Sequence, residues 1–364
     1  MRIGFLGRCL GHSGGIGRYA RSLLDALARV STDELVLLCN RPPAAPPANV
    51  RVVCRERSGV ASILAWEQLE LPLIARAEGL DLLYNPDFVV PAAWRGPAVV
   101  TVHDVSYALL RRFAGLRAML YYGAFARGSA KRAGRVLTVS EFSKRAICRL
   151  FDLAPGKVAV ARPAADAIFR VLEQGEVRRG CEELRLAGGY VLYVGLLGGW
   201  KNLARLLRAF AGARGIGAAE LVLAGKSCAD TPGILREAAR LGLGQRLRVL
   251  QDVPDAALPL LYNGARAFVF PSLYEGFGLP PIEAMACGVP VICSNAGALP
   301  ETTAGAAWLV DPRDTEALSR AIETVLGDDA LRKRMIGAGL RRAAQLSWEA
   351  CARTVLRVFH EVGS

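Results

Sequence analysis

Short continuous apolar runs alternate with segments of helical spacing through the first half of the chain. The runs at Arg2–Leu6 and Leu35–Cys39 predict strands buried on both faces, and the apolar residues of Gly17–Arg29 recur at helical intervals. Further strands are predicted at Val50–Cys54, Leu82–Tyr84, Ala98–Val102 and Arg135–Val139. Strands and helices that alternate in this way form a parallel sheet covered on both faces.

The same alternation begins again at Tyr190–Val194 and predicts a second sheet. Between the two series, residues 156–185 contain Pro163 and a charged, glycine-containing patch, which predicts an irregular connection between domains. The tail Trp348–Val362 has its apolar residues on one side, as an amphipathic helix does. The other elements predicted in this half are strands at Glu220–Ala224, Leu247–Leu250, Ala267–Phe270 and Val289–Cys293, and helices at Asn202–Ala213 and Gly233–Leu241.

These elements predict an α/β protein with two Rossmann-like, doubly wound domains that face a deep cleft. Ligands of such sheets bind at the carboxyl ends of the strands. We expect a first domain at 1–170, a second at 171–345 and a C-terminal helix at 346–364. The length of 364 residues agrees with two domains, and the content of 52% apolar and 22% charged residues indicates a well-buried folded protein.

Composition disfavours several classes of protein and site. No apolar stretch reaches membrane-spanning length, and the first apolar run is too short for a signal peptide. The nine cysteines form no Cys-x-x-Cys pair and mostly lie in apolar surroundings, so we expect reduced thiols in a cytoplasmic protein. The three histidines are scattered, and we expect no metal site and no bound cofactor.

The net charge of +13 is concentrated in the first half of the chain. Residues 1–180 hold 26 Lys and Arg against 15 Asp and Glu, whereas residues 181–364 hold 20 against 18. Two interpretations stay open: a general preference for arginine, or contact of the first half with an anionic lipid or membrane surface. The basic, partly apolar segment Leu109–Arg135 could lie on a membrane interface or be a solvated helix face. The absence of aromatic residues interleaved with basic ones disfavours nucleic acid.

The most informative segment is Glu275–Glu283, with the sequence Glu-Gly-Phe-Gly-Leu-Pro-Pro-Ile-Glu. It follows a predicted buried strand and leads through two prolines into a predicted helix that Gly288 ends. A helix N-terminus offers free backbone N–H groups to an anion, and the two carboxylates could accept hydrogen bonds from hydroxyls. The segment therefore indicates a phosphorylated, hydroxyl-bearing ligand, unless Glu283 only caps the helix and Glu275 only faces solvent.

Three more loops lie at predicted strand ends. The glycine-rich loop Gly11–Arg18 precedes a helix, and its glycines would let the backbone approach a ligand or would only form a tight turn. His103 and Asp104 directly follow a strand. Lys201 lies after a Gly-rich turn, where it suits a diphosphate or is an ordinary solvated lysine. Together the loops indicate recognition of phosphate and hydroxyl groups, for which a nucleotide sugar is the best-fitting ligand.

These motifs resemble, in order along nearly the whole chain, those of glycosyltransferase family 4, which are retaining enzymes of the GT-B fold. Glu275 and Glu283 match the Glu-x7-Glu motif of the family, and Lys201 matches its Arg-Lys-Asn turn. The other matching segments are Gly14–Tyr19, Thr101–Asp104, Thr138–Lys144, Pro271–Pro280, Leu299–Glu301 and Leu309–Pro312. The resemblance implies a nucleotide-sugar donor bound by the second domain and a tail helix that crosses back onto the first domain.

The resemblance also implies a role for each matching residue. In the first domain, His103 would contact the transferred sugar. In the second, Lys201 would hold the leaving diphosphate, Glu275 the sugar hydroxyls and Glu283 the ribose. The remaining residues that would bind substrate are Gly14, Gly15, Asp104, Phe277, Gly278 and Leu279.

The function implied is metal-independent transfer of a hexosyl unit, with retention, to a glycan or lipid-linked acceptor in surface polysaccharide or glycoconjugate synthesis. Among donors, GDP-mannose is favoured over UDP- and dTDP-sugars. Trp200 and Leu196 depart from the pattern, because many family members carry basic residues there. Either Lys201 suffices, or Lys226 or Arg205 compensates, or the protein is a sugar-nucleotide-binding relative with weak or no turnover.

Overall fold

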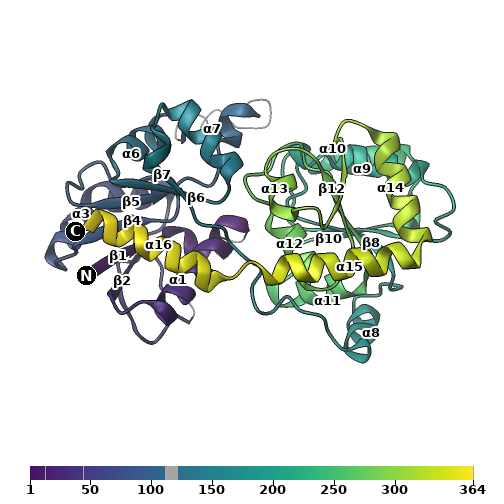
Figure 1. Ribbon diagram of the computed structural model, residues 1–364, viewed down its shortest axis with the longest axis horizontal. Coiled ribbons are helices and arrows are strands. Elements are labelled where there is room, and N and C mark those ends of the chain that lie inside the picture. The colour runs from purple at the N-terminus through teal and green to yellow at the C-terminus, as the bar shows by residue number, and fades with distance from the viewer. Residues whose placement is uncertain (13, 44, 111–121, 364) are drawn as a thin grey trace. The chain divides into compact units, whose positions relative to one another are not determined.

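A computed structural model describes residues 1–12, 14–43, 45–110 and 122–363 of the chain. Residues 111–121 of the basic segment Leu109–Arg135, with three of its arginines, lie outside the described residues, so the membrane interface or solvated helix face stays a prediction there. The chain forms two compact units (Figure 1). Unit 1 comprises Met1–Pro163 and Ser347–Ser364, and unit 2 comprises Ala164–Leu346.

The described part of unit 1 contains a parallel sheet of seven strands in the order β3-β2-β1-β4-β5-β6-β7. The strands at the centre of the sheet, β1, β4 and β5, are short and almost fully buried, as expected where helices cover both faces. The strands are β1 (Arg2–Leu6), β2 (Glu34–Cys39), β3 (Val50–Cys54), β4 (Leu82–Asn85), β5 (Ala98–Thr101), β6 (Arg135–Thr138) and β7 (Val158–Val160).

The helices of unit 1 include one from the far end of the chain. The helix α16 packs along α1 and against β4, β5 and β6, with Phe359 in ring contact with Tyr84 (Figure 1). The helices are α1 (Gly15–Val30), α2 (Val60–Ala65), α3 (Leu71–Ala77), α4 (Ser106–Leu109), α6 (Arg127–Arg132), α7 (Glu141–Phe151) and α16 (Trp348–Gly363), with π-helical turns at Trp66–Glu70 and Tyr122–Ala126 and 3-10 turns at Arg8–Gly11 and Pro155–Lys157.

Unit 2 contains a second parallel sheet, of six strands within the described residues, in the order β10-β9-β8-β11-β12-β13. Its core includes the stacked rings of Phe268 and Phe270, and Tyr193 stacks on Phe270. The strands are β8 (Tyr190–Val194), β9 (Leu221–Ala224), β10 (Leu247–Leu250), β11 (Ala265–Phe270), β12 (Val291–Ser294) and β13 (Trp308–Val310).

Helices also pack against one another in unit 2. The helix α12 packs against α15, and α9 packs against α14. The helices are α8 (Gln174–Glu183), α9 (Leu203–Gly212), α10 (Thr231–Arg240), α11 (Leu258–Gly264), α12 (Leu279–Ala286), α13 (Leu299–Thr303), α14 (Thr315–Gly327) and α15 (Asp329–Ala344), with 3-10 turns at Gly199–Lys201, Gly244–Arg246 and Asp255–Ala257.

The predicted α/β class, with two doubly wound parallel sheets, is confirmed, and most predicted strands lie within a residue or two of their observed bounds. The prediction of irregular structure over residues 156–185 is wrong near both ends, where β7 and α8 lie, whereas residues 161–173 contain no helix or strand. Only Gly180 and Cys181 of α8 are buried, so the helix has no apolar stripe to reveal it. The described part of the chain has no helix that is both long and apolar enough to span a bilayer.

Strand order indicates where each sheet offers a ligand site. In unit 1 the order reverses between β1 and β4, and in unit 2 it reverses between β8 and β11. Loops at the carboxyl ends of such neighbouring strands diverge to opposite faces and leave a crevice. The loops after β1, β4 and β5, and those after β8 and β11, are therefore the places to look for chemistry.

Candidate active site

The turn between β11 and α12 is held by the segment that follows β12. Gly278 ends the turn with φ +100°, a backbone conformation that favours glycine, and a Cβ there would lie 2.6 Å from the end of the Leu299 side chain. No side chain caps α12, and because Pro280 and Pro281 carry no N–H, Leu279 is the one residue of the first three in the helix that can donate a backbone hydrogen bond to a ligand. Three hydrogen bonds fix carbonyls of the turn, at 2.6, 3.0 and 2.7 Å: Ser294 Oγ to Ser272 O, Ala298 N to Glu275 O and Thr302 Oγ1 to Phe277 O.

Lys201 and Glu275, which the sequence assigns to different parts of a ligand, form an ion pair. The Lys201 Nζ lies 2.6 Å from Glu275 Oε1, and each side chain is only 14% exposed. The pair forms because β8 and β11 are neighbours, so the loops that follow them meet. The ammonium group also lies 5.1 Å from the centre of the Phe270 ring, a cation–π contact. An anion that binds Lys201 must compete with the carboxylate of Glu275.

Glu283 lies inside α12 and is fully buried. Its Oε2 accepts a hydrogen bond of 2.9 Å from the Tyr262 hydroxyl. The side chain therefore lies close to the predicted turn but is covered, and a ribose could reach it only after the covering groups move. The backbone of Phe277, Gly278 and Leu279 lies at the N-terminus of the same helix.

The two proposed substitutes for the missing basic residue differ in what their side chains contact. Arg205 donates from Nη1 to the Pro312 carbonyl at 2.6 Å and from Nε to Thr315 Oγ1 at 3.2 Å, so it is committed to holding α9 against the loop before α14. Lys226 follows β9, is exposed and forms no ion pair within the described residues. A Cβ at Gly225 would lie 1.8 Å from the Gly195 carbonyl, so the two strand ends touch and Lys226 lies beside the loop that leads to Lys201.

In unit 1, the glycine-rich loop after β1 leads into α1. Gly14 has φ +132°, α1 begins at Gly15, and no side chain or acidic residue caps its N-terminus. A Cβ built at Gly14 or Gly15 would meet no atom within 4 Å, so this helix end faces open space within unit 1. Gly17 differs, because a Cβ there would lie 1.9 Å from the His12 carbonyl. Residue 13 of the predicted loop lies outside the described residues.

His103 follows β5 and is held by the loop after β4. Its Nε2 lies 2.8 Å from the Pro86 carbonyl, which can only accept, so Nε2 carries the hydrogen. The Tyr19 ring packs edge-on against the imidazole at 4.7 Å. Burial lowers the pKa of His103, although Asp87 and Asp104 act in the opposite direction, so the ring is neutral near pH 7 with a lone pair on Nδ1. Asp104 Oδ1 accepts from the Ser106 amide at 2.8 Å.

An ionic cluster beside His103 is absent from the sequence prediction. Arg8, directly after β1, lies 2.8 Å from Asp87 and 3.2 Å from Glu67, and both carboxylates are almost completely buried. We call these three residues the Arg8 cluster. Its signal in the sequence is the position of Glu67, which shares one helical stripe with the buried Leu71 and Ala75. A carboxylate on a buried stripe is rare unless it is paired.

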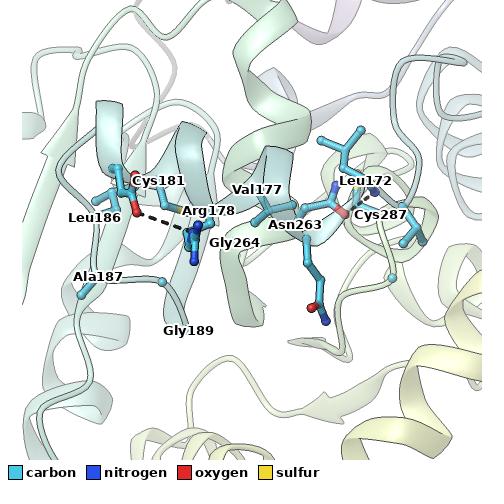
Figure 2. A pocket seen from close by; sticks show the side chains of 15 residues that line it. Leu172, Val177, Arg178, Cys181, Leu186, Ala187, Gly189, Asn263, Gly264 and Cys287 are labelled. Atoms are coloured by element: carbon cyan, nitrogen blue, oxygen red, sulfur yellow. Dashed lines mark hydrogen bonds and ion pairs between the residues drawn. The ribbon is translucent and has the colours of Figure 1, made fainter.

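A cavity of about 560 Å³ lies in unit 2, away from these residues (Figure 2). Gly189 and Gly264 on its wall directly precede β8 and β11, so it lies at the amino ends of the strands, whereas Lys201 and Glu275 lie at the carboxyl ends. Figure 2 also shows Cys181 and Asn263 on its wall. Within the described residues, no three His, Cys, Asp or Glu side chains gather so that they could hold a metal ion.

Two family models match consecutive parts of the chain. Residues 13–167 match the model described as Glycosyltransferase Family 4, and residues 182–342 match the model described as Glycosyl transferases group 1. Lys201, Glu275 and Glu283 fall within the second match, and Gly14, Gly15 and His103 within the first.

Similar proteins include an O-antigen chain mannosyltransferase B of Escherichia coli, 34% identical over 77% of this chain and 74% of that protein. A serotype-specific mannosyltransferase WbdA of Escherichia coli is 29% identical over 63% of this chain but only 29% of its own length. Among solved structures, a sucrose-phosphate synthase from Thermosynechococcus elongatus superposes with a TM-score of 0.81 over 99% of this chain and 98% of that one, at 21% identity. The structural likeness shows the GT-B fold.

Proposed function

The chain belongs to glycosyltransferase family 4, and on that premise we propose that it transfers a hexosyl unit from a nucleotide sugar to a glycan or lipid-linked acceptor, with retention and without a metal. The observation that carries the proposal is the Lys201–Glu275 pair next to the uncapped N-terminus of α12. A cation and helix amides suit a diphosphate, and a carboxylate suits sugar hydroxyls.

In the proposed reaction, the bond from the anomeric carbon to the diphosphate oxygen breaks as the acceptor hydroxyl approaches from the same face. The sugar passes through an oxocarbenium-like state, and the hydroxyl proton moves to the departing diphosphate. Lys201 and the backbone amides of Phe277, Gly278 and Leu279 offset the negative charge that develops there, and Glu275 positions the sugar. His103, neutral and fixed by Pro86, contacts the transferred sugar. The remaining proposed substrate contacts are Gly14, Gly15, Asp104, Phe277, Gly278, Leu279 and Glu283.

For the donor we propose GDP-mannose or a close relative. The support is the glycine-rich loop and the turn at Glu275–Glu283, together with the two relatives that are named for mannosyl transfer. One relative is named for the O-antigen chain and the other is named as serotype-specific, which supports a role in surface polysaccharide synthesis. We propose that this role is carried out in the cytoplasm. UDP- and dTDP-sugars are the donors to be tested against it.

The second candidate function is that of a sugar-nucleotide-binding protein with weak or no turnover. Trp200 and Leu196 favour it, since they stand where many family members have cations. The hydrogen bond from Arg205 to the Pro312 carbonyl favours it further, because this guanidinium group is already used within the protein. The exposed Lys226 beside the same loop favours the enzyme, because a flexible ammonium group there could reach a diphosphate.

We propose that unit 1 also contacts an anionic membrane that carries the acceptor. The helical segment from α2 to α3 exposes three large apolar side chains: Val60 (78% exposed), Leu69 (66%) and Leu73 (62%). Leu69 and Leu73 lie four residues apart on one helical face, and exposed apolar side chains on a basic protein suit a shallow position at the lipid headgroups. Together with the excess of basic residues in residues 1–180, these exposed side chains support a peripheral contact.

One pair of measurements tests the proposal. A thermal-shift screen of GDP-, UDP- and dTDP-sugars identifies the donor, because a ligand that binds the native state raises its melting temperature. Donor hydrolysis and transfer by the purified chain then separate enzyme from binding protein. Lys201→Ala should slow turnover by about a hundredfold or more, and near-normal turnover would contradict its role.

A further inference from the structure

The Arg8 cluster has one cation for two carboxylates in a place that water hardly reaches. The side chains of Glu67 and Asp87 are 0% and 3% exposed, and that of Arg8 is 16% exposed. With every group ionised, the cluster would hold an uncompensated buried negative charge, which is costly. One of the carboxyls must therefore be neutral or strained.

The geometry identifies Glu67 as the neutral carboxyl. Asp87 accepts a hydrogen bond of 2.8 Å from Arg8, whereas Glu67 lies 3.2 Å away and neither of its oxygens has a hydrogen-bond partner among the described residues. Burial, reinforced by the charge of Asp87 and opposed by Arg8, raises the pKa of Glu67 to about 7. The groups that face Glu67 are Arg8 and Cys9 from the turn after β1 and Asp87 from the loop after β4.

Asp87 is the middle of a strap, residues 86–88, that holds His103. The Pro86 carbonyl receives the His103 Nε2 hydrogen, and the Phe88 ring lies 5.7 Å from the imidazole. Phe88 has φ +59°, a strained conformation for a residue with a side chain, and its amide donates to the Thr101 carbonyl. Such strain persists only where the surroundings over-determine the backbone, and the bond from Asp87 to Arg8 is one of those restraints.

We propose that Glu67 is a positioning residue for sugar transfer: through Arg8 and Asp87 it fixes the strap that orients His103. This inference rests on the role proposed for His103 in the reaction. When Glu67 is neutral, its side chain holds Arg8 in place without competing for the charge of Arg8, so Arg8 pairs with Asp87 and the strap is held. When Glu67 ionises, it competes for Arg8 and repels Asp87, and the strap loosens. Turnover then falls as the pH rises through neutrality.

The test compares Glu67→Gln, which is neutral at every pH and nearly the same size, with Glu67→Ala, which removes the contact to Arg8. Gln68→Ala is the matched control, because Gln68 lies on the same π-helical turn but bonds the Ala92 amide and not the cluster. Two readouts are made on each full-length protein: kcat and donor KM from pH 5.5 to 8.5, and the ring resonances of His103. The chain has only three histidines, so His12→Gln and His360→Gln variants assign the signals.

We expect Glu67→Ala to lower kcat on the order of tenfold with an unchanged donor KM, as misorientation without loss of binding should. Wild-type kcat should fall above about pH 7, and its His103 signals should shift with the same midpoint. Glu67→Gln should match wild type at pH 6 and lack both transitions. Gln68→Ala should behave as wild type.

The inference is overturned if Glu67→Gln keeps the wild-type pH profile and the His103 transition, or if Glu67→Ala leaves kcat unchanged. Because the magnetic resonance readout needs no turnover, it also separates this inference from the proposed function. A protein that shows the His103 transition, loses it in Glu67→Gln, yet turns over no nucleotide sugar would retain the network and refute the proposed function.

Discussion

Replacing Glu275 with glutamine should strengthen the binding of a free nucleoside diphosphate, although the same change removes a group assigned to the sugar. In the unliganded protein the Lys201 ammonium is already paired with Glu275 at 2.6 Å. A diphosphate must displace that carboxylate before it gains the full charge of Lys201. Glutamine keeps the size of the side chain and removes the competing charge.

The magnitude follows from the environment of the pair. Fully exposed ion pairs contribute about 0.2–1 kcal/mol, and this pair, with both side chains 14% exposed, belongs at or above the upper end. If the diphosphate no longer has to overcome about 1 kcal/mol of pairing free energy between Lys201 and Glu275, it should bind roughly fivefold tighter. Lys201→Met should act in the opposite direction, because a charged hydrogen bond contributes about 1.5–3 kcal/mol, or roughly ten- to a hundredfold in affinity.

Isothermal titration of GDP and UDP into the wild type, Glu275→Gln, Lys201→Met and the double variant completes the test. The gain in diphosphate affinity from Glu275→Gln should vanish in the Lys201→Met background, since Glu275 then has no ammonium group for which it competes with the diphosphate. With the intact nucleotide sugar, Glu275→Gln should lower kcat because the sugar loses a hydroxyl acceptor. Weaker GDP binding in Glu275→Gln, or an equal effect in both backgrounds, would refute the competition.

Four other predictions use different parts of the molecule. Lys226→Met should raise the donor KM about tenfold, because the Lys226 ammonium group would no longer contact the diphosphate. A donor KM equal to that of the wild type would show that Lys226 does not bind the donor. Trp200→Arg should tighten binding of GDP in the same titration by restoring a cation beside Lys201, and weaker binding would show that the indole itself is needed. Burial raises the pKa of Glu67 from 4.5 to about 7, so the folded state retains a proton that the unfolded state loses, and stability is lost as the pH rises from 4.5 through 7. That loss is about 3 kcal/mol and should be absent in Glu67→Gln when melting temperatures are compared from pH 4.5 to 8. Leu73→Glu should abolish sedimentation with anionic liposomes at low salt, while neutral liposomes serve as the control.

The strands were predictable because buried parallel strands are continuous apolar runs, which few other structures imitate. Both Tyr190–Val194 and Arg2–Leu6 appear where the sequence places them. Elements without such a run were missed for a physical reason. Three-residue strands such as β7 and β13 are too short to carry a pattern, and α8 is mostly exposed. The π-helical turn at Trp66–Glu70 is set by tertiary packing and leaves no period in the sequence.

For the candidate site, the sequence predicted which loops matter but not how their side chains meet. The pairing of Lys201 with Glu275 depends on β8 and β11 being neighbours, which is a property of strand order. The burial of Glu283 under Tyr262 likewise depends on how α11 packs beside α12. Arg8, Glu67 and Asp87 were missed because each belongs to a different loop or helix and none lies in a recognisable motif.

The return of α16 to unit 1 has a consequence for how the chain is made. Residues 347–364 complete the core of unit 1, with Trp348 against Tyr19 and Phe359 against Tyr84, yet they leave the ribosome only after all of unit 2. Unit 2 is one continuous segment and can fold as soon as it emerges. Unit 1 must wait with part of its apolar surface uncovered, which makes it the part of the nascent protein most exposed to chaperones and to aggregation.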